Sequence, residues 1–519
     1  MGGLGRKRLV IFLLYVFMEK KIVVIGAGIA GLSAGCYARM NGYETEIYET
    51  HSIPGGLCTS WKRGEYTIDG CLQWLTGSAP GNSFYRFWKE LGAIQGRKMY
   101  DREEFCRFTG SDGRTFIAYS NVDRLEKHMK EFSPGDAETT ELFCRLVRKF
   151  TTFEAPIDKA FERYRITDYA RLMWQMFPYM KDLGFCTRLT IGDFARRFKD
   201  PFLREVFPMI IDSADMSLFV LVSTMALLHI KAGGFPEGGL LVFARSIEQR
   251  FISLGGEIFY GKSVEKILVK EGKACGILLE NGEQISADYV ISCADLSNTL
   301  YNMLGGKYIE PQHEELFQTA KIYHSSVQVS FGVNMDLTQE PGCVADITKL
   351  EMPMLIGNEK MEWLRVHNYS FDATLAPKGR TVVLCLIPVE NFDYWEKLYT
   401  DKKAYKVEKE RIAKVVAEEL ERKYPGFISR TEVTDVLTPM TYVRYTDNYH
   451  GTYMTWVMTP DLMKHHRLVK KTLPGLKNFW LSGMWVQPPG GVPSGAKSSR
   501  DILQMICRQD NKKFRTSEA

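Results

Sequence analysis

The sequence lacks several features that would assign it to a class directly. Its 11 cysteines form no Cys-x-x-Cys pair, which predicts reduced thiols in a cytoplasmic protein rather than a disulfide framework. Neither sign of charge dominates: 67 basic and 62 acidic residues give a net charge of +5, and this balance argues against a nucleic-acid partner. The nine histidines join no carboxylate or thiol cluster, and His465 and His466 are adjacent and point apart. The sequence therefore predicts no metal site.

The first 17 residues lack the length of a membrane-spanning helix. Their apolar run, from Leu9 to Phe17, is shorter than the roughly 20 residues that a bilayer requires. No small-residue cleavage site of a signal peptide precedes Met18. We interpret residues 1–18 as an extension upstream of a natural start, with a weak interfacial anchor as the alternative.

A β-α-β pattern with glycines at fixed spacing follows. "KKIVVIGAG" predicts a buried strand, "IAGLSAGCYARMNG" a helix, and "YETEIYET" a second strand that carries Glu49 near its end. Gly26 permits a tight turn, Gly28 lets the backbone approach a pyrophosphate, and Gly31 lets helix and strand pack closely. Glu49 lies 21 residues after Gly28 (49 − 28), which suits a carboxylate on a ribose hydroxyl. The segment predicts a dinucleotide at the helix N-terminus.

Later segments repeat the strand, glycine turn and helix order. They begin at "GGFPEGG" and at "GLKNFWLSG". Residues about 96–225 are expected to be largely helical. Residues about 311–465 are expected to mix strands such as "SSVQVSFGV" and "GRTVVLCLIPV" with an amphipathic helix around "EKERIAKVVAEELERKY". We therefore predict an α/β fold: a Rossmann-type dinucleotide-binding domain assembled from discontinuous segments, with an α+β substrate domain inserted. The expected nucleotide domain comprises 19–95, 226–310 and 466–508; the expected substrate domain comprises 96–225 and 311–465, and 509–519 form a flexible tail.

From Lys20 to about Cys507 the chain resembles the flavin-dependent amine-oxidase-like superfamily. Within it, the chain is similar to the branch of phytoene desaturases, carotenoid isomerases and retinol saturases. The resemblance is carried by "VVIGAGIAGLSAG", "IYETHSIPGGLCTSWKRGEYTID", "GGFPEGG", "SVEKIL", "LTPMTYVRYT" and "LSGMWVQPPGGVPSGA". It implies that the dinucleotide is FAD, bound by Gly26, Gly28, Ile29, Ala30, Gly31, Glu49, Gly55, Gly56, Leu57, Ser60, Val264, Gly483, Gly491 and Val492.

The C-terminal motif also has a physical interpretation. Pro488-Pro489-Gly490-Gly491 predicts a rigid turn, and a helix starting near Pro493 would direct its N-terminus at the flavin. Such a dipole favours the negative charge of reduced flavin by roughly 0.3–1 kcal/mol. Only one full dinucleotide fingerprint is present, so electrons are expected to pass through the substrate, a quinone, oxygen, free reduced flavin or a protein partner. NAD(P)H bound without a Rossmann unit stays open.

The sequence departs from the family pattern after the second glycine pair. Saturase and isomerase relatives tend to have Phe-Asp-x-Gly-x-His-Tyr, whereas this chain has "IDGCLQWL", with Gln73 in place of the histidine and Trp74 in place of the tyrosine. Glutamine cannot shuttle a proton near neutral pH as histidine can. We therefore do not carry over the relatives' substrate. Gln73, Trp74 and Trp485 are our candidate substrate-pocket residues.

A catalytic acid or base is sought in "TYVRYTDNYHG". A tyrosine hydroxyl or a histidine there would protonate a carbanion at an alkene carbon, and we select His450 and Tyr445 as catalytic candidates. The alternative interpretation is that these residues belong to a strand that packs on a sheet.

The segment "MWQMFPYM", residues 173–180, has two interpretations. Its methionines and aromatics suit an apolar tunnel or a membrane-facing surface that admits a long lipid, or they form the core of a helix bundle. The basic run "KHHRLVKK", residues 464–471, either contacts an anionic bilayer or is a solvated face. A peripheral position on the inner face of the membrane is therefore one expectation for this cytoplasmic protein.

Together these observations predict an FAD-dependent oxidoreductase. It would desaturate, saturate or isomerise carbon–carbon bonds of a hydrophobic, isoprenoid or polyene-like small molecule by hydride transfer at flavin N5. The alternatives are amine-oxidase-like C–N oxidation or isomerisation of a polyunsaturated fatty acid on the same fold, and a non-catalytic flavoprotein. The sequence gives no indication of the oligomeric state.

Overall fold

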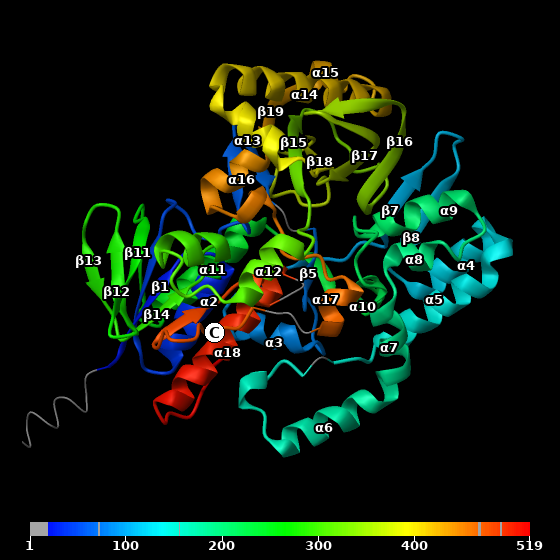
Figure 1. Ribbon diagram of the computed structural model, residues 1–519. Coiled ribbons are helices and arrows are strands. Elements are labelled where there is room, and N and C mark those ends of the chain that lie inside the picture. Colours follow the sequence, from blue (N-terminus) through cyan, green and yellow to red (C-terminus); the bar gives the residue numbers. More distant parts are fainter. Residues whose placement is uncertain (1–18, 71–72, 155, 466–468, 488–489) are drawn as a thin grey trace, which may run out of the picture.

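A computed structural model describes residues 19–70, 73–154, 156–465, 469–487 and 490–519 of the chain (Figure 1). The expected N-terminal extension, residues 1–18, lies outside this described part. Two large sheets organise the molecule: a parallel sheet at the left of Figure 1 and a mostly antiparallel sheet at the upper right.

The parallel sheet has the strand order β10-β2-β1-β14-β20. Its central strand has the sequence KIVVI, which suits a strand that is covered on both faces. The strands come from three separated parts of the chain: β1 (Lys21–Ile25), β2 (Glu44–Glu49), β10 (Glu257–Tyr260), β14 (Tyr289–Ser292) and β20 (Phe479–Leu481). The predicted α/β fold class, with a sheet built from discontinuous segments, is confirmed.

The two faces of the parallel sheet pack against different elements, because successive side chains of a strand alternate. Ile22 and Val24 join a core shared with three helices, α2 (Ile29–Met40), α11 (Leu240–Ser253) and α18 (Gly491–Gln509). Val23 and Ile25 join the core beneath a small antiparallel sheet of β11 (Val264–Lys270), β12 (Lys273–Leu279) and β13 (Gln284–Ser286). The helix N-termini of α2 and α18 thereby reach the same edge of the sheet.

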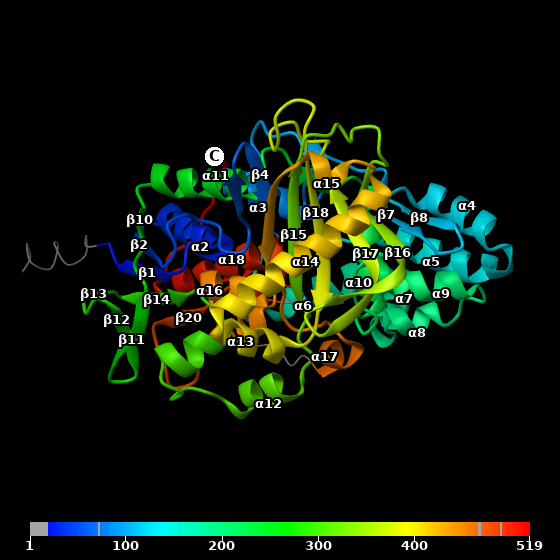
Figure 2. The ribbon, with the colours of Figure 1, turned by 90° about the horizontal axis from the view of Figure 1, so that it is seen from above.

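The second large sheet has seven strands in the order β19-β15-β18-β17-β16-β7-β8. Only the β16–β7 pair is parallel. Every residue of β15 is buried, because helices cover one face of the sheet and the rest of the molecule covers the other. Seen from above, α14 runs across β15 and β18 (Figure 2). The elements are β7 (Glu104–Thr109), β8 (Thr115–Tyr119), β15 (Ser325–Val333), β16 (Cys343–Ile356), β17 (Glu359–Asn368), β18 (Thr381–Val389), β19 (Thr431–Leu437), α13 (Phe392–Thr400), α14 (Lys402–Lys423) and α15 (Phe427–Arg430).

Shorter elements connect the two sheets. One small sheet consists of β3 (Ser60–Arg63) paired with β4 (Tyr66–Asp69). In a second small sheet, β9 (Gly233–Pro236) lies between β5 (Leu75–Thr76) and β6 (Met99–Tyr100). The connecting helices are α3 (Ser83–Glu90), α12 (Pro311–Thr319), α16 (Pro439–Thr446) and α17 (Pro460–His465).

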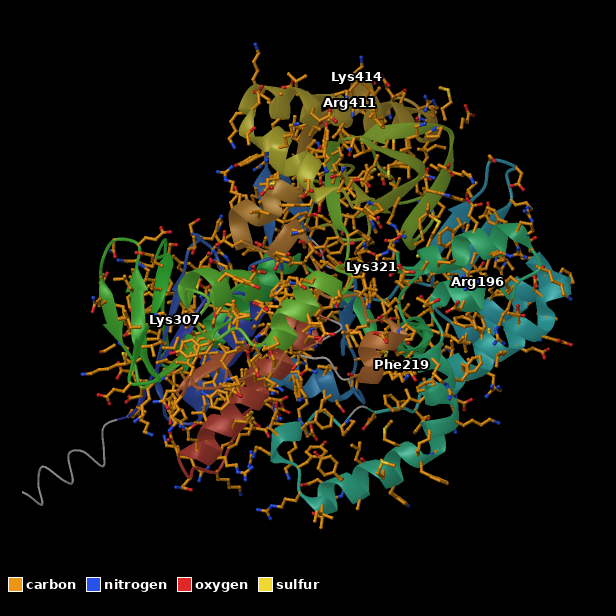
Figure 3. The ribbon with its side chains drawn as sticks, in the orientation of Figure 1. Arg196, Phe219, Lys307, Lys321, Arg411 and Lys414 are labelled. Carbon is orange, nitrogen blue, oxygen red and sulfur yellow. The ribbon has the colours of Figure 1, made fainter. Side chains whose placement is uncertain are left out.

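A helical region beside β7 and β8 has its own phenylalanine-rich core. In it Phe219 of α10 packs edge-to-face on Phe150 of α5, with ring centroids 5.5 Å apart (Figure 3). The helices are α4 (Val122–Phe132), α5 (Ala137–Phe150), α7 (Met180–Arg188), α8 (Ile191–Ala195), α9 (Pro201–Val206) and α10 (Leu218–His229).

Helix α6 (Ile166–Met176) contributes nothing to this core. None of its residues is buried, and the helix stands off from the body of the molecule below α3 and α7 (Figure 1). Trp174 is 80% exposed and Phe177 is 76% exposed. The core interpretation of "MWQMFPYM" is therefore wrong for these two side chains and for Met173 and Met180, which are also exposed. Within the described part of the chain, none of the helices has both the length and the apolar character needed to traverse a bilayer.

Candidate functional site

The β1–α2 unit and the loop after β2 each contain a contact at which only glycine fits. A Cβ on Gly31 would lie 1.8 Å from the carbonyl oxygen of Gly26, and one on Gly55 would lie 2.2 Å from that of Cys58. The Gly55 N–H donates to the carbonyl of Ala27 at 2.9 Å, which joins the two glycine-rich segments. No side chain caps the N-terminus of α2 at Gly28. Its N–H groups therefore face open space, as an anion-binding helix N-terminus requires.

Glu49 ends β2 beside this turn. Its carboxylate accepts hydrogen bonds from the backbone N–H groups of Ala27 at 2.6 Å and His51 at 2.8 Å. Burial raises the pKa of Glu49, and these two hydrogen bonds oppose the rise. The side chain thus fixes the turn and borders the cavity next to it. Its contact with a ribose stays a prediction.

A cavity of about 240 Å³ opens at this edge of the parallel sheet. It brings together residues from four distant stretches of the chain. The predicted cofactor residues that line it are Gly26, Gly28, Ile29, Ala30, Glu49, Gly55, Gly56, Leu57, Val264, Gly483, Gly491 and Val492. Gly31 packs behind the lining, against β1. We call this space the cofactor cleft.

Helix α18 presents a second uncapped N-terminus to the cofactor cleft. Its N-cap is Gly490, with φ +94°, and no side chain caps it. The helix approaches α2 closely enough that a Cβ on Gly495 would lie 3.3 Å from the Cβ of Ala30. The predicted proline turn at 488–489 lies outside the described residues. Two positive helix ends therefore converge on one cavity, which suits an anionic ligand.

A larger cavity of about 310 Å³ adjoins the cleft. The two share six lining residues: Glu49, Gly56, Leu57, Arg444, Tyr445 and Thr446. Ser60 lines only this second cavity, and its hydroxyl accepts a hydrogen bond from the Leu241 N–H at 3.1 Å. The catalytic candidate Tyr445 thus stands between the two spaces. It lies in α16, a helix rather than the strand that we considered.

The structure does not bring His450, the other catalytic candidate, to these cavities. Its side chain is exposed and stacks on Phe392, with ring centroids 4.9 Å apart, and it belongs to the lining of neither space. Trp485, by contrast, is buried and lines the cofactor cleft, where its indole N–H donates to the Asn448 side-chain oxygen at 3.0 Å.

The other two pocket candidates lie elsewhere. Gln73 lines a third, much smaller cavity of about 20 Å³. Trp74 packs edge-to-face on Phe105 at 5.1 Å and contacts the helical core. Neither is part of the lining of the cofactor cleft or of the adjoining cavity.

Sequence reasoning missed several lining residues of the cofactor cleft. Arg444 is the one cation among its described lining residues. Asp295 accepts hydrogen bonds from the N–H groups of Asn298 and Tyr449, both at 2.9 Å, and burial raises its pKa to about 6. Tyr453 also lines the cleft. Arg444 lies within "LTPMTYVRYT", one of the stretches that carry the family resemblance, and this was the available signal. Asp295 and Tyr453 carried no comparable signal.

The geometry defines a cleft for a dinucleotide. Two uncapped helix N-termini suit a pyrophosphate, and the glycine contacts leave no room for side chains where the backbone must approach it.

Comparison with known proteins gives the family. The model of the family described as flavin containing amine oxidoreductase matches residues 29–503, and the chain belongs to this family. The cofactor is FAD, and the protein is a flavin-dependent oxidoreductase. Among curated proteins, it is 28% identical over 484 residues to a chloroplastic prolycopene isomerase of Daucus carota, covering 87% of this chain and 72% of the relative. It is 24% identical over 514 residues to a lycopene-forming phytoene desaturase of Paracoccus sp., covering 94% and 97%.

Solved structures share the fold. An oxidoreductase from Methanosarcina mazei has a TM-score of 0.57 at 17% identity, over 93% of this chain and 100% of that one. Wild-type putrescine oxidase bound to putrescine has a TM-score of 0.60 at 13% identity, over 95% and 99%. These likenesses establish the architecture.

Proposed function

We propose that the protein desaturates, saturates or isomerises carbon–carbon bonds of an elongated isoprenoid or polyene. Its curated relatives are named as a prolycopene isomerase and a phytoene desaturase. One observation in the structure carries the proposal: Tyr453 lines the cofactor cleft and also packs against the apolar cluster of Phe235, Tyr369, Leu384 and Leu386 beneath the seven-stranded sheet. Apolar side chains therefore adjoin the cofactor cleft on the side of the seven-stranded sheet.

The protein's own residues hold and orient the reactants. FAD, when bound, supplies the capacity to accept or donate a hydride. The N-terminus of α18 favours negative charge at the inner end of the cleft. Desolvation holds the pKa of Tyr453 well above its usual value, so its hydroxyl stays protonated and serves as a hydrogen-bond donor rather than a base. Buried Trp485 and Trp456, which pack edge-to-face at 4.9 Å, exclude water.

Flavin reduction by candidate substrates tests this proposal. Purified holoprotein is mixed anaerobically with linear polyenes of increasing unsaturation, and the visible flavin spectrum is followed. We expect bleaching by a substrate that is desaturated, or re-oxidation of pre-reduced flavin by one that is saturated. Primary amines serve as the comparison. Bleaching by amines with no response to any polyene contradicts the proposal.

We also propose that the sheets mark two domains. The FAD-binding domain comprises 19–95, 226–310 and 466–508, which contain all strands of the parallel sheet. The substrate domain comprises 96–225 and 311–465, which contain all strands of the seven-stranded sheet. Limited proteolysis of holoprotein and apoprotein tests the division: we expect removal of FAD to increase cleavage mainly in the first set of segments.

A hydrophobic substrate must be delivered to the protein, and the exposed helix α6 supports delivery from a membrane. We propose that α6 and its continuation to Met180 lie on an anionic bilayer. Ile166, Tyr169, Met173 and Phe177 recur at three- and four-residue steps, so they form one stripe, and all are exposed. Arg165, Arg171 and Lys181 flank this stripe and are exposed too. An exposed apolar stripe edged by cations is typical of interfacial helices.

The base of α6 is fixed to the helix that borders the cofactor cleft. The Arg500 guanidinium of α18 donates to the Asp158 carbonyl at 2.6 Å, and the Ala160 N–H donates to the Gln504 side chain at 3.2 Å. Lys471 forms an ion pair with Glu162 at 2.8 Å. A docked α6 would therefore hold the cleft at a fixed orientation to the bilayer.

Vesicle flotation tests the docking. We expect the protein to float with vesicles of phosphatidylcholine and phosphatidylglycerol, and about tenfold less with phosphatidylcholine alone, because the cations lose their partner. Trp174→Glu combined with Phe177→Glu is expected to abolish flotation. Met352→Glu is the matched control, since Met352 is 73% exposed on β16, away from α6. Equal flotation of all variants, or self-association through α6 in place of flotation, would refute the docking.

A further inference from the structure

The adjoining cavity, of about 310 Å³, is larger than the cofactor cleft and has a wall largely of its own. Apart from the six shared residues, its wall comes mainly from the loop after β2, from β3 and β19, and from the first halves of α14 and α16. Its tryptophan and tyrosine side chains are Trp61, Tyr399, Tyr405, Tyr442 and Tyr445. An apolar and aromatic wall with a few polar groups is typical of a small-molecule site. The cavity therefore suits a ligand other than the dinucleotide.

Lys409 supplies this wall with a cation that has no counter-ion. It lies on α14, is half-buried, and lines the adjoining cavity but not the cofactor cleft. Its ammonium lies 5.7 Å from the ring centroid of Tyr405, and within the described residues it forms no ion pair or hydrogen bond. Burial lowers the pKa of Lys409, and the charge of Asp435 opposes this shift. The positive charges of Arg63 and Arg444 lower it further. A partly desolvated cation of this kind gains from an anion in the cavity.

The carboxylates of the same wall already have partners. Asp435 accepts a hydrogen bond from the Trp61 indole N–H at 2.6 Å, and it lies 3.4 Å from the Arg63 guanidinium. Glu49 accepts from two backbone N–H groups at the glycine turn. These partners hold both carboxylates away from Lys409. The described part of the wall therefore offers positive charge to a ligand from Lys409 and leaves its negative charges engaged.

Arg444 extends the positive charge to the boundary with the cofactor cleft. It lines both spaces, and its guanidinium carbon lies 5.2 Å from the ring centroid of Tyr445. Arg444 is exposed, whereas Lys409 is half-buried, so the two cations occupy the rim and the wall of one cavity. Two positive charges that repel each other across a shared space favour an anionic occupant.

We propose that the adjoining cavity binds a small acid with an apolar body, which places its carboxylate at Lys409 and its body against the aromatic wall. A carboxylate pairs with the ammonium through a charge-assisted hydrogen bond. An alcohol of the same shape brings no opposite charge, and an amine is repelled. The site does not depend on the proposed function, because its ligand is defined by the charge and the apolar wall alone.

Calorimetric titration of the FAD-loaded protein tests the site. The probes are decanoate, decanol and decylammonium, which share an apolar chain and differ in the charge of the head group. We expect decanoate to bind about tenfold more tightly than decanol, as one charge-assisted hydrogen bond at a half-buried site allows, and decylammonium to bind most weakly. Loading with FAD beforehand keeps the cofactor cleft filled during the titration.

Variants on α14 assign the effect to one side chain. Lys409→Met is expected to bring the decanoate-to-decanol ratio close to one, with the decanol Kd and the FAD content unchanged, because Lys409 does not border the cofactor cleft. Lys409→Arg, which keeps the charge, is expected to retain most of the ratio. Lys414→Met is the matched control: Lys414 lies on the same helix with its side chain 77% exposed, and it is expected to keep the wild-type ratio (Figure 3).

Three results would overturn the site. Equal binding of decanoate and decanol to the wild type refutes it and leaves the proposed function standing. An unchanged ratio in Lys409→Met also refutes it, since the acid would then bind elsewhere, for instance on the stripe of α6. Displacement of FAD by decanoate would place the acid in the cofactor cleft instead.

A polyunsaturated acid, linolenate, separates two sources of the acid. Its conversion by the holoprotein, followed by mass spectrometry, would identify the acid as a substrate. Binding that depends on Lys409 without conversion would identify a ligand that does not react. Both of these results support the site.

Discussion

Replacing Gly31 with alanine tests whether the turn after β1 is built for close backbone approach. The added Cβ would lie 1.8 Å from the carbonyl oxygen of Gly26, whereas ordinary contact begins near 3.4 Å, so the two must separate by about 1.6 Å (3.4 − 1.8). The obstacle is backbone, which cannot rotate away as a side chain can. Overpacking of a core costs typically 1–3 kcal/mol, and we expect the upper end, about 3 kcal/mol, in the free energy of unfolding.

The same displacement distorts the cofactor cleft. Gly26 and Gly28 line it directly, and α2 would move relative to β1. We therefore expect Gly31→Ala to purify with about a tenth or less of the wild-type FAD, measured as visible flavin absorbance per protein, because a shift of about 1 Å at a positioning contact has a large effect on binding. Gly42→Ala is the matched control: its φ is +70° and nothing lies within 4 Å of the added Cβ. It is expected to cost about 1–2 kcal/mol through its left-handed backbone and to retain FAD.

The two outcomes are separable by experiment. Denaturant unfolding of the FAD-free proteins gives the cost of the steric overlap alone, and FAD titration gives the effect on the cleft. If Gly31→Ala keeps wild-type FAD content and unfolds at the wild-type midpoint, the packing argument for this glycine is refuted.

Three further changes test the cleft and its surroundings. Glu49→Ala removes the acceptor of the buried N–H groups of Ala27 and His51, and we expect a free energy of unfolding lower by about 2–4 kcal/mol, with loss of FAD on dialysis. Arg444→Met removes the cation of the cleft; FAD titration of the apoprotein is expected to show about tenfold weaker affinity with an unchanged unfolding midpoint. Burial raises the pKa of Asp69 to about 7, above its ordinary value near 3.9, so its folded form holds a proton that the unfolded chain has lost. Asp69 is therefore expected to contribute a loss of stability of up to about 4 kcal/mol as pH rises from about 4 to about 7. Buried His367, whose pKa is lowered to about 3, changes stability in the opposite direction, so the Asp69 contribution is measured as the difference between wild-type and Asp69→Asn unfolding curves across that range.

Opposite results would contradict each argument. Full FAD retention in Glu49→Ala would show that the turn holds without its carboxylate. A destabilised Arg444→Met apoprotein would assign that side chain to packing. Wild-type and Asp69→Asn stabilities that change in parallel between pH 4 and pH 7 would show that Asp69 is already ionised in the folded protein.

Local sequence patterns were sufficient for the parts of the fold that are close in sequence. The strand, turn and helix around Gly26, Gly28 and Gly31 form as predicted, because the contacts that require glycine there lie within one β-α-β unit. The long helix α14 and strands β15 and β18 also lie where their periodicity placed them.

Patterns failed where the contact partner was distant in the chain. His450 was selected because it lies a few residues from Tyr445, yet the turn after α16 directs it to Phe392 on the protein surface. Asp295 and Tyr453 come to the cleft from the ends of other elements, and nothing adjacent to them in sequence marks that position.

The sequence by itself determined the dinucleotide site, because a pyrophosphate is recognised by backbone geometry that a few spaced glycines encode. The family resemblance, carried by motifs along the chain, added FAD as the dinucleotide. Only the tertiary structure decided which side of an apolar stripe faces solvent. The stripe of α6 has the same periodicity as a core helix, and it is exposed solely because no other element packs on it.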